Sequence, residues 1–337
     1  MRRFSYQRAQ GPAEAVLMAT AGAADSHSKA EFLAGGTTLL DLMKLDVMRP
    51  DTVIDINPLA AAGYGRIELN QHGLRLGALV RMADAADHPG IKSTYPVVAQ
   101  SLAQAASQQL RNMASLGGNV LQRTRCTYFR DVSYRECNKR NPGSGCAAMS
   151  GFNRIHAVLG GSDRCIATYP GDFAQALIAL EAAVEIASGS GNRTIPFANL
   201  HRKPADTPDK ETNLLSGEMI AAFLIPAANW TRRSLYLKVR DRESYEFALA
   251  SAAVALDQQN GIVRAARIAL GGLATVPWRA MEAESFLRGK PVNEDNAKAA
   301  ASAAFADAQG HGHNDFKIEL GKRTLSRALQ QTAALEI

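Results

Sequence analysis

Short apolar runs that end at glycine or proline turns dominate the first 80 residues. They predict strands at residues 32–34, 53–56 and 74–78, because each run is brief and is bounded by turn residues. Between the first two runs, apolar residues return at helical spacing over residues 38–45, so a helix is expected directly after the pair Gly35-Gly36. The pattern therefore predicts a small α/β unit at the start of the chain.

The middle of the chain contains longer periodic segments around a polar interruption. Residues 95–111 carry apolar positions along one helical face and lead into a second pair, Gly117-Gly118. Residues 172–183 again have a helical period, and residues 184–186 and 219–225 are predicted strands. Residues 122–165 are too polar and too rich in glycine, asparagine and arginine for a core element, so we interpret them as an insertion.

A new pattern begins near residue 234, after a predicted boundary at residues 226–233. We expect a strand at 235–239, an alanine-rich helix at 247–256, a strand at 263–270, a turn at Gly271-Gly272 and at least two final helices. The fold class predicted for the whole chain is α+β.

Composition narrows the functional classes. The 337 residues carry a net charge of +6 and 46% hydrophobic residues, with both signs of charge scattered along the chain. Neither a basic stripe nor a nucleic-acid-binding motif is present, which disfavours nucleic-acid binding. No apolar run reaches the roughly 20 residues that span a bilayer, and no apolar signal core follows the opening residues. Taken alone, the chain is expected to be soluble and unexported.

All four cysteines lie within one window of forty residues: Cys126, Cys137, Cys146 and Cys165. Their spacing lacks the paired C-x2-C of structural zinc sites. Two disulfides are the alternative if the protein is exported, whereas four thiolates can ligate a [4Fe–4S] cluster without fixed spacing. A loop this polar needs an anchor to become ordered. Six nearby basic side chains would offset the negative charge of the cluster: Arg123, Arg125, Arg130, Arg135, Lys139 and Arg140. We therefore favour the cluster.

Two glycine loops are candidate cofactor sites. The loop at residues 34–39 follows a predicted strand and opens a predicted helix, so its backbone N–H groups can converge on a phosphate. It lacks the G-x-G-x-x-G fingerprint of dinucleotide-binding folds. The loop at residues 115–119 places a serine before the second glycine pair. Either loop alone is as readily an ordinary turn, but two together suit a diphosphate held from both sides.

These loops resemble the pair in the flavin subunits of the xanthine dehydrogenase (molybdenum hydroxylase) family. The likeness extends over nearly the whole chain, and residues 167–172 resemble the segment that normally follows the second loop directly. Glu31 stands where relatives often carry a cation, so no charged phosphate contact is assigned there. The resemblance implies that FAD is bound by Leu33, Ala34, Gly35, Gly36, Thr37, Thr38, Leu39, Ser115, Gly117, Gly118, Asn119, Asp172, Ile220 and Lys238.

The cysteine insertion is similar to that of the flavin subunit of bacterial periplasmic aldehyde oxidoreductase, and related insertions occur in 4-hydroxybenzoyl-CoA reductase. The resemblance implies a PCMH-type FAD-binding domain at residues 1–228, with α/β subdomains at about 1–57 and 58–228 and the [4Fe–4S] insertion at 122–165. A C-terminal α+β domain of the CO dehydrogenase flavoprotein type would follow at residues 229–337.

The function implied is electron transfer. A molybdenum-cofactor subunit and a [2Fe–2S] subunit, forming a heterotrimer with this chain, would supply electrons from an aldehyde, and FAD would pass them to an external acceptor. No catalytic acid or base is expected in this chain. Export to the periplasm with a signal-bearing partner is implied, with the cytoplasm as the alternative. The alternative functions are the flavin subunit of a hydroxylase acting on xanthine or 4-hydroxybenzoyl-CoA, and a cluster-bearing scaffold without turnover.

Overall fold

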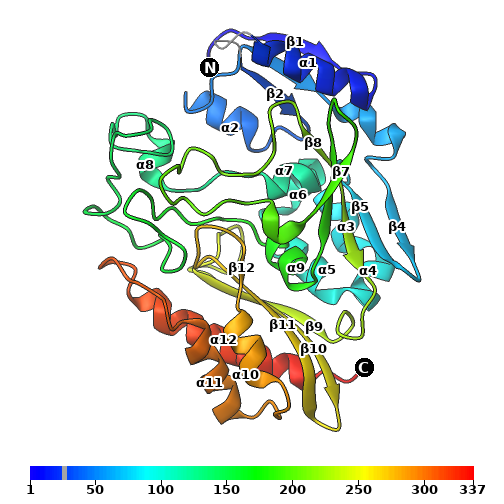
Figure 1. Cartoon of the computed structure of the whole chain (residues 1–337), viewed down its shortest axis with the longest axis vertical. Helices are drawn as coiled ribbons and strands as arrows, with labels where there is room; N and C mark the ends of the chain where they lie inside the picture. The colour runs from blue at the N-terminus through cyan, green and yellow to red at the C-terminus, as the bar shows by residue number, and fades with distance from the viewer. Residues whose placement is uncertain (25–28) are drawn as a thin grey trace.

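The computed structural model describes residues 1–24 and 29–337, whose strands form three sheets in a row (Figure 1). The first sheet has the order β1-β3-β2 and is parallel, with β1 at Ser5–Arg8, β2 at Ala30–Leu33 and β3 at Thr52–Asp55. Helix α1 (Pro12–Ala24) packs on this sheet through Ala15 and Val16, and α2 (Leu39–Lys44) follows β2. The predicted helix after Gly36 and an α/β unit at the start of the chain are confirmed, but the strand predicted at residues 74–78 belongs to the second sheet.

The second sheet is antiparallel and has the order β4-β5-β8-β6-β7. Its central strand β8 is the apolar run predicted at residues 219–225, and all but two of its residues are buried. The helices of this unit pack around one core with the sheet. The elements are η1 (Asn57–Ala62), β4 (Ile67–Asn70), β5 (Gly73–Gly77), α3 (Met82–Asp87), α4 (Pro89–Thr94), α5 (Pro96–Ala103), α6 (Gln108–Met113), α7 (Leu116–Val120), α9 (Phe173–Ala179), β6 (Ala183–Ala187), β7 (Arg193–Pro196), η2 (Phe197–Asn199) and β8 (Met219–Pro226).

The single helix predicted at residues 95–111 is wrong, because the chain forms two helices there. Helix α5 ends at Ala103, and Ala106 adopts a left-handed backbone conformation with φ +50°. The Ser107 hydroxyl then accepts a hydrogen bond from the Leu110 N–H at 3.3 Å and caps α6. The turn redirects the chain toward the second glycine loop.

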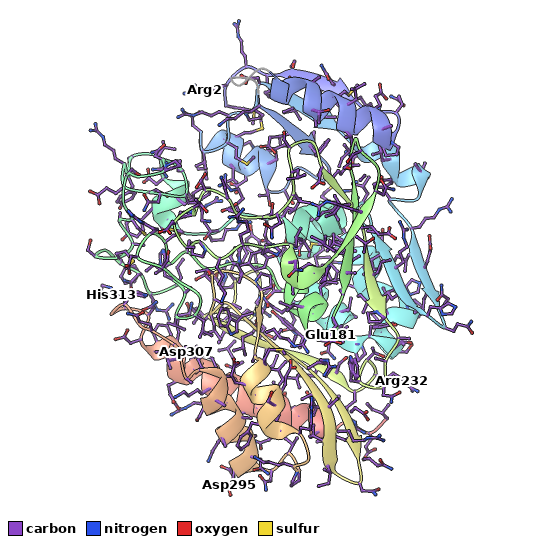
Figure 2. The ribbon with its side chains drawn as sticks, viewed as in Figure 1. Arg2, Glu181, Arg232, Asp295, Asp307 and His313 are labelled. Atoms are coloured by element: carbon purple, nitrogen blue, oxygen red, sulfur yellow. The ribbon has the colours of Figure 1, made fainter. Side chains whose placement is uncertain are left out.

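The third sheet is antiparallel, with the order β12-β11-β10-β9, and the C-terminal helices cover one of its faces (Figure 1). The elements are β9 (Ser234–Val239), β10 (Ala250–Gln259), β11 (Ile262–Gly271), β12 (Trp278–Arg279), α10 (Met281–Leu287), α11 (Glu294–Ala304) and α12 (Phe316–Ala333). Glu181, labelled in Figure 2, joins this sheet to the middle unit through ion pairs with Arg267 at 2.9 Å and Arg279 at 3.2 Å.

The alanine-rich helix predicted at residues 247–256 is wrong, because most of that segment is the central strand β10. Its side chains alternate between two cores: Ala252 and Val254 pack under the C-terminal helices, while Ala253 and Ala255 face the middle unit. Alanine has a high helix propensity, but a strand buried on both faces needs small side chains where helices approach from both sides. Tertiary packing therefore overrides the local preference.

The insertion at residues 122–165 contains one short helix, α8 (Thr127–Arg130), and bridges the other units. Arg125 and Arg130 both form ion pairs with Asp41 of α2. At the other end Val158 and Leu159 are buried in the core of the C-terminal unit, so this part of the insertion does belong to a core. In Figure 1 the insertion lies beside α2 and the start of α12. None of the helices in residues 1–24 and 29–337 is long and apolar enough to span a membrane.

Candidate cofactor site

The first glycine loop lies directly against the backbone that leads into the second loop. A Cβ atom on Gly35 would overlap the carbonyl oxygen of Met113, so only glycine allows this approach. Gly36 has φ +72°, a left-handed conformation that also favours glycine. Both glycines of the pair therefore have a steric reason to be there, and the reason at Gly35 is contact between the two loops.

The first loop presents free donors. Over the described ranges 1–24 and 29–337, the structure shows no hydrogen bond from the backbone N–H groups of Gly35, Gly36 and Thr37. Thr38 precedes α2 and makes no capping hydrogen bond with its side chain. Backbone donors without an acceptor next to a cavity are suited to an anionic group such as a phosphate.

The second loop differs from the first, because its N–H groups are already used. Gly117 donates to the carbonyl oxygen of Ala78 at 2.8 Å, and Gly118 donates to the Ser115 hydroxyl at 3.2 Å. A Cβ on Gly117 would lie 3.1 Å from the Cβ of Ala78, tighter than an ordinary contact. The second loop thus contributes a close-packed wall, and the first contributes the anion donors.

Both loops line one cavity of about 480 Å³, within the usual size range of cofactor and ligand pockets. Phe32, Met48 and Ile56 form part of its apolar wall. The predicted cofactor residues that line it are Ala34, Gly35, Gly36, Thr37, Thr38, Leu39, Ser115, Gly117, Gly118 and Ile220. The sequence separation of these segments shows that the fold, and not one local motif, assembles the cavity.

Arg123 is the one cationic side chain among the residues that line this cavity, and sequence reasoning did not assign it to the cofactor. Its Nε lies 2.8 Å from Glu211 Oε2. Burial raises the pKa of Glu31, and the nearby Arg123 opposes that rise. Its place four residues after Asn119 was a signal, but the sequence linked Arg123 only to the neighbouring cysteines.

Four predicted cofactor residues lie outside the set that lines the cavity. Leu33 ends strand β2, and Asn119 has a buried Oδ1 atom without a hydrogen-bond partner in the described structure. Asp172 and Lys238 pair with each other at 2.8 Å, with side chains that are only 5% and 1% exposed. Burial raises the pKa of Asp172. Lys238 and the Tyr236 hydroxyl, which donates to Asp172 Oδ1 at 2.6 Å, oppose this rise. The contact of these residues with a cofactor stays a prediction.

The four cysteines line a second, much smaller cavity. Cys126, Cys137 and Cys165 are buried, Cys146 is half-buried, and all four are free thiols, so the disulfide alternative is not formed. The backbone of Cys137 pairs with that of Cys146 in a short antiparallel bridge. The chain thus brings together four thiols from a segment that has only one turn of helix.

The chemistry of the donor set fits a thiolate-bound cluster. No group of three or more His, Cys, Asp or Glu side chains within residues 1–24 and 29–337 is already arranged around a metal position, so the four sulfurs share a cavity without being preset for an ion. The N–H of Ala167 donates to the Cys165 sulfur at 3.4 Å, and His156 Nε2 lies 3.1 Å from the Cys126 sulfur. Hydrogen bonds to sulfur are a usual feature of iron–sulfur ligation.

Burial controls the protonation of these thiols. It raises the pKa of Cys126 to about 12 and that of Cys165 to about 11, although Lys139 opposes the rise at Cys165. Without a metal, the Cys126 and Cys165 thiols would therefore be protonated at neutral pH, and metal binding would displace their protons. Among the expected basic residues, Lys139 lines the cysteine cavity, whereas Arg140 donates to the carbonyl oxygens of Tyr128 and Phe129.

Comparison with known proteins assigns the family. The model described as "FAD binding domain in molybdopterin dehydrogenase" matches residues 2–228, and that of the "CO dehydrogenase flavoprotein C-terminal domain" matches residues 235–332. The chain belongs to the molybdopterin dehydrogenase flavoprotein family. It is a FAD-binding medium subunit of the molybdenum hydroxylase type and hence part of an oxidoreductase. The family and fold class predicted from the sequence are confirmed.

Relatives of this flavoprotein match over their full length. It is 45% identical to the aldehyde oxidoreductase FAD-binding subunit PaoB of Escherichia coli, with 99% of each chain covered. It is 26% identical to the glyceraldehyde dehydrogenase medium chain of Sulfolobus acidocaldarius, with 98% of each covered. The solved carbon monoxide dehydrogenase of Hydrogenophaga pseudoflava is similar with a TM-score of 0.75 and 25% identity, covering 99% of this chain and 98% of that one.

Proposed function

We propose that FAD binds in the cavity between the two glycine loops, with its diphosphate at the free N–H groups of Gly35, Gly36 and Thr37. The observation that carries the proposal is the contact of Gly35 with the backbone at Met113, which joins two distant loops into one cavity. Arg123 would supply the positive charge that Glu31 does not. The bound flavin supplies the electron-transfer chemistry, and this chain's residues bind and orient it.

We also propose that the substrate of the whole enzyme is an aldehyde, and that the physiological partners are a molybdenum-cofactor subunit and a [2Fe–2S] subunit in a heterotrimer. Support comes from the relative at 45% identity, which is named an aldehyde oxidoreductase subunit, and from the second relative, which is named a glyceraldehyde dehydrogenase. The periplasm, reached together with a signal-bearing partner, is the proposed compartment.

The four cysteines are proposed to hold a [4Fe–4S] cluster. Cys126, Cys137, Cys146 and Cys165 would be the ligands, and their shared cavity, their free state and the N–H donor at Cys165 support the assignment. When bound, the cluster supplies a one-electron redox centre and an anchor for residues 122–165. The chain's own contribution is to exclude water, because three of the four thiols are buried.

The flavin proposal is tested with Gly35→Ala and the control Gly11→Ala. The added methyl group in Gly35→Ala overlaps the Met113 carbonyl and must separate the loops, whereas nothing lies within 4 Å of the position that it would occupy at Gly11. We expect purified wild type and Gly11→Ala to release FAD on denaturation and Gly35→Ala to bind it at least about tenfold more weakly. A wild-type protein without flavin absorbance would refute the proposal.

The cluster proposal is tested by iron and acid-labile sulfide analysis of the wild type and of Cys146→Ser. Four irons with matching sulfide are expected in the wild type, and a clear loss of both in the variant. Zinc without sulfide, or unchanged iron in the variant, would show that these cysteines serve another purpose. A C-terminal control such as Ser302→Ala should keep the wild-type iron content, because Ser302 lies in α11, outside the cysteine segment.

A further inference from the structure

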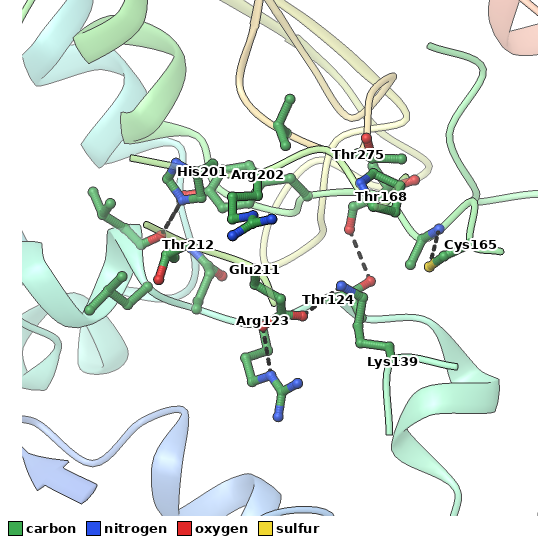
Figure 3. Close-up of a pocket in the computed structure, with 17 residues that line it drawn as sticks. Arg123, Thr124, Lys139, Cys165, Thr168, His201, Arg202, Glu211, Thr212 and Thr275 are labelled. Atoms are coloured by element: carbon green, nitrogen blue, oxygen red, sulfur yellow. Dashed lines mark hydrogen bonds and ion pairs between the residues drawn. The ribbon is translucent and has the colours of Figure 1, made fainter. Parts of the chain in front are cut away.

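We call the cavity between the two glycine loops the flavin cavity, and the cavity lined by the four cysteines the cysteine cavity. Two ion pairs of one carboxylate connect them. Glu211 Oε2 lies 2.8 Å from Arg123 Nε, and Glu211 Oε1 lies 2.7 Å from Lys139 Nζ. We call these three side chains the Glu211 bridge. Figure 3 shows Glu211 between Arg123 and Lys139, with Cys165 nearby. Each carboxylate oxygen pairs with one cation, so the bridge joins residues 123 and 139 to Glu211, which lies 88 residues after Arg123 in the chain.

Each end of the bridge belongs to a different cavity. Arg123 and Glu211 line the flavin cavity, and the Arg123 guanidinium lies 4.5 Å from the centre of the Phe129 ring, which lines the cysteine cavity. Lys139 lines the cysteine cavity and lowers the pKa of Cys165 against the effect of burial. A pocket lined by Arg123, Lys139, Cys165 and Glu211 lies between the two. The flavin cavity and the cysteine cavity have no lining residue in common, but each shares lining residues with this pocket.

The bridge is partly shielded from solvent and electrically unbalanced. The side chains of Lys139, Arg123 and Glu211 are 11%, 22% and 26% exposed. Burial alone would raise the pKa of Glu211, but Lys139 and Arg123 outweigh it and lower that pKa, so the carboxylate is charged at neutral pH. Two cations share one anion, and the remaining positive charge favours a further anion at either end, such as a diphosphate or a thiolate-bound cluster.

Glu211 also controls where Arg123 points. Glu31, which is part of the flavin cavity wall, is a second carboxyl group on which the charge of Arg123 acts. Without the Glu211 carboxylate, Arg123 would turn toward Glu31 and neutralise it instead of facing a phosphate. The loop that carries Glu211 is itself held in place, because Lys139 also donates to the Pro208 carbonyl oxygen at 2.9 Å. Disorder around Lys139 would therefore change the position of Glu211, and through Glu211 the position of Arg123.

We propose that Glu211 is a positioning residue that couples FAD binding to occupancy of the cysteine cavity. The inference rests on the proposed function, since it needs both FAD and the cluster. A filled cysteine cavity orders Lys139, Lys139 holds Glu211, and Glu211 holds Arg123 toward the flavin cavity. Because coupling between two binding events is reciprocal, FAD must also stabilise the filled cysteine cavity by the same factor.

The test measures the FAD dissociation constant of the intact, co-purified complex before and after iron is removed with a chelator. The variants are Glu211→Gln and the control Glu185→Gln, which removes a carboxylate of similar exposure, 30%, paired with Arg75 at 2.8 Å away from both cavities. In the wild type and the control, we expect iron removal to weaken FAD binding about three- to tenfold. Glu211→Gln should start about that much weaker and respond little to iron removal.

Two further variants separate positioning from a general loss of structure. Glu211→Asp keeps the charge and should recover part of the affinity, and Lys139→Met should reproduce the insensitivity to iron from the other end of the bridge. The coupling is overturned if Glu211→Gln binds FAD as tightly as Glu185→Gln, or if it responds to iron removal as the wild type does. If Cys146→Ser leaves the iron content of the complex unchanged, the cluster proposal and the coupling fail together. If Cys146→Ser lowers the iron content and the complex binds flavin, but Glu211→Gln has no effect, the coupling alone is overturned.

Discussion

Lys317 is a charged residue whose surroundings predict an unusual dependence of stability on pH. It lies at the start of α12 and its side chain is fully buried. Its Nζ donates to the carbonyl oxygens of Ile155 at 3.2 Å and His156 at 2.9 Å. Burial, together with the nearby charge of Arg154, lowers the pKa of Lys317 to about 7. The amine therefore attaches α12 to the cysteine segment at the cost of carrying a buried positive charge.

The sign of the effect follows from the two protonation states. Above pH 7 the folded state releases the Lys317 proton, whereas the unfolded chain holds it up to about pH 10.5, so the free energy of unfolding rises with pH in that window. The whole difference in pKa corresponds to about 5 kcal/mol, and the step from pH 7.5 to 9.5 to about 3 kcal/mol. For a chain of this length that is a rise in Tm of about 4 °C.

The assay compares thermal unfolding of the wild type, Lys317→Met and Lys92→Met at pH 7.5 and 9.5. Lys317→Met keeps the length of the side chain without the charge and should lose the rise of about 4 °C, while Lys92, whose side chain is 54% exposed, should leave it intact. Parallel profiles for the wild type and Lys317→Met would refute the reasoning, because they would mean that Lys317 keeps its proton when folded.

Two other substitutions test the packing between units. Lys238→Met leaves the Asp172 carboxylate buried without its cation, and this should lower the free energy of unfolding of the apoprotein by about 3–5 kcal/mol, as measured by thermal unfolding. Adding Asp172→Asn to the same chain should recover most of the loss. Ala253→Leu adds volume to the face of β10 that meets the middle unit, and we expect it to lower the free energy of unfolding, measured with denaturant, by about 1–3 kcal/mol. The control Ala265→Leu, at a half-buried position of β11, should change it much less.

The sequence predicted most strands and both glycine loops because these depend on local constraints. Gly36, whose φ of +72° favours glycine, and the turn residues around the apolar runs mark places where the local backbone conformation restricts the residue type. The failure at β10 has the opposite origin. Its alanines are selected by helices on both faces of the sheet, and nothing within the segment itself reveals that environment.

In the site, too, features that depend on the local sequence were predicted, whereas features that depend on tertiary contacts were not. The resemblance identified the loop residues that line the flavin cavity, and the clustering of the cysteines predicted that they would meet. Arg123 and Glu211 are distant in sequence and belong to no motif, so their pairing became visible only in the folded chain. Charged side chains that act through tertiary contacts are therefore the site residues that sequence patterns predict least well.

The position of the cysteine insertion explains how it interrupts the flavin site without dismantling it. The two ends of the insertion are joined: the Thr124 hydroxyl donates to the Thr168 carbonyl oxygen at 2.9 Å, and the Tyr169 hydroxyl donates to the Val120 carbonyl oxygen at 2.8 Å. The chain leaves after the second glycine loop and returns to the same place before α9, so the length between is tolerated at a small entropic cost. Because the excursion starts at the wall of the cavity between the glycine loops, the cysteine cavity lies close to it, and one carboxylate, Glu211, pairs with Arg123 of the first cavity and with Lys139 of the second.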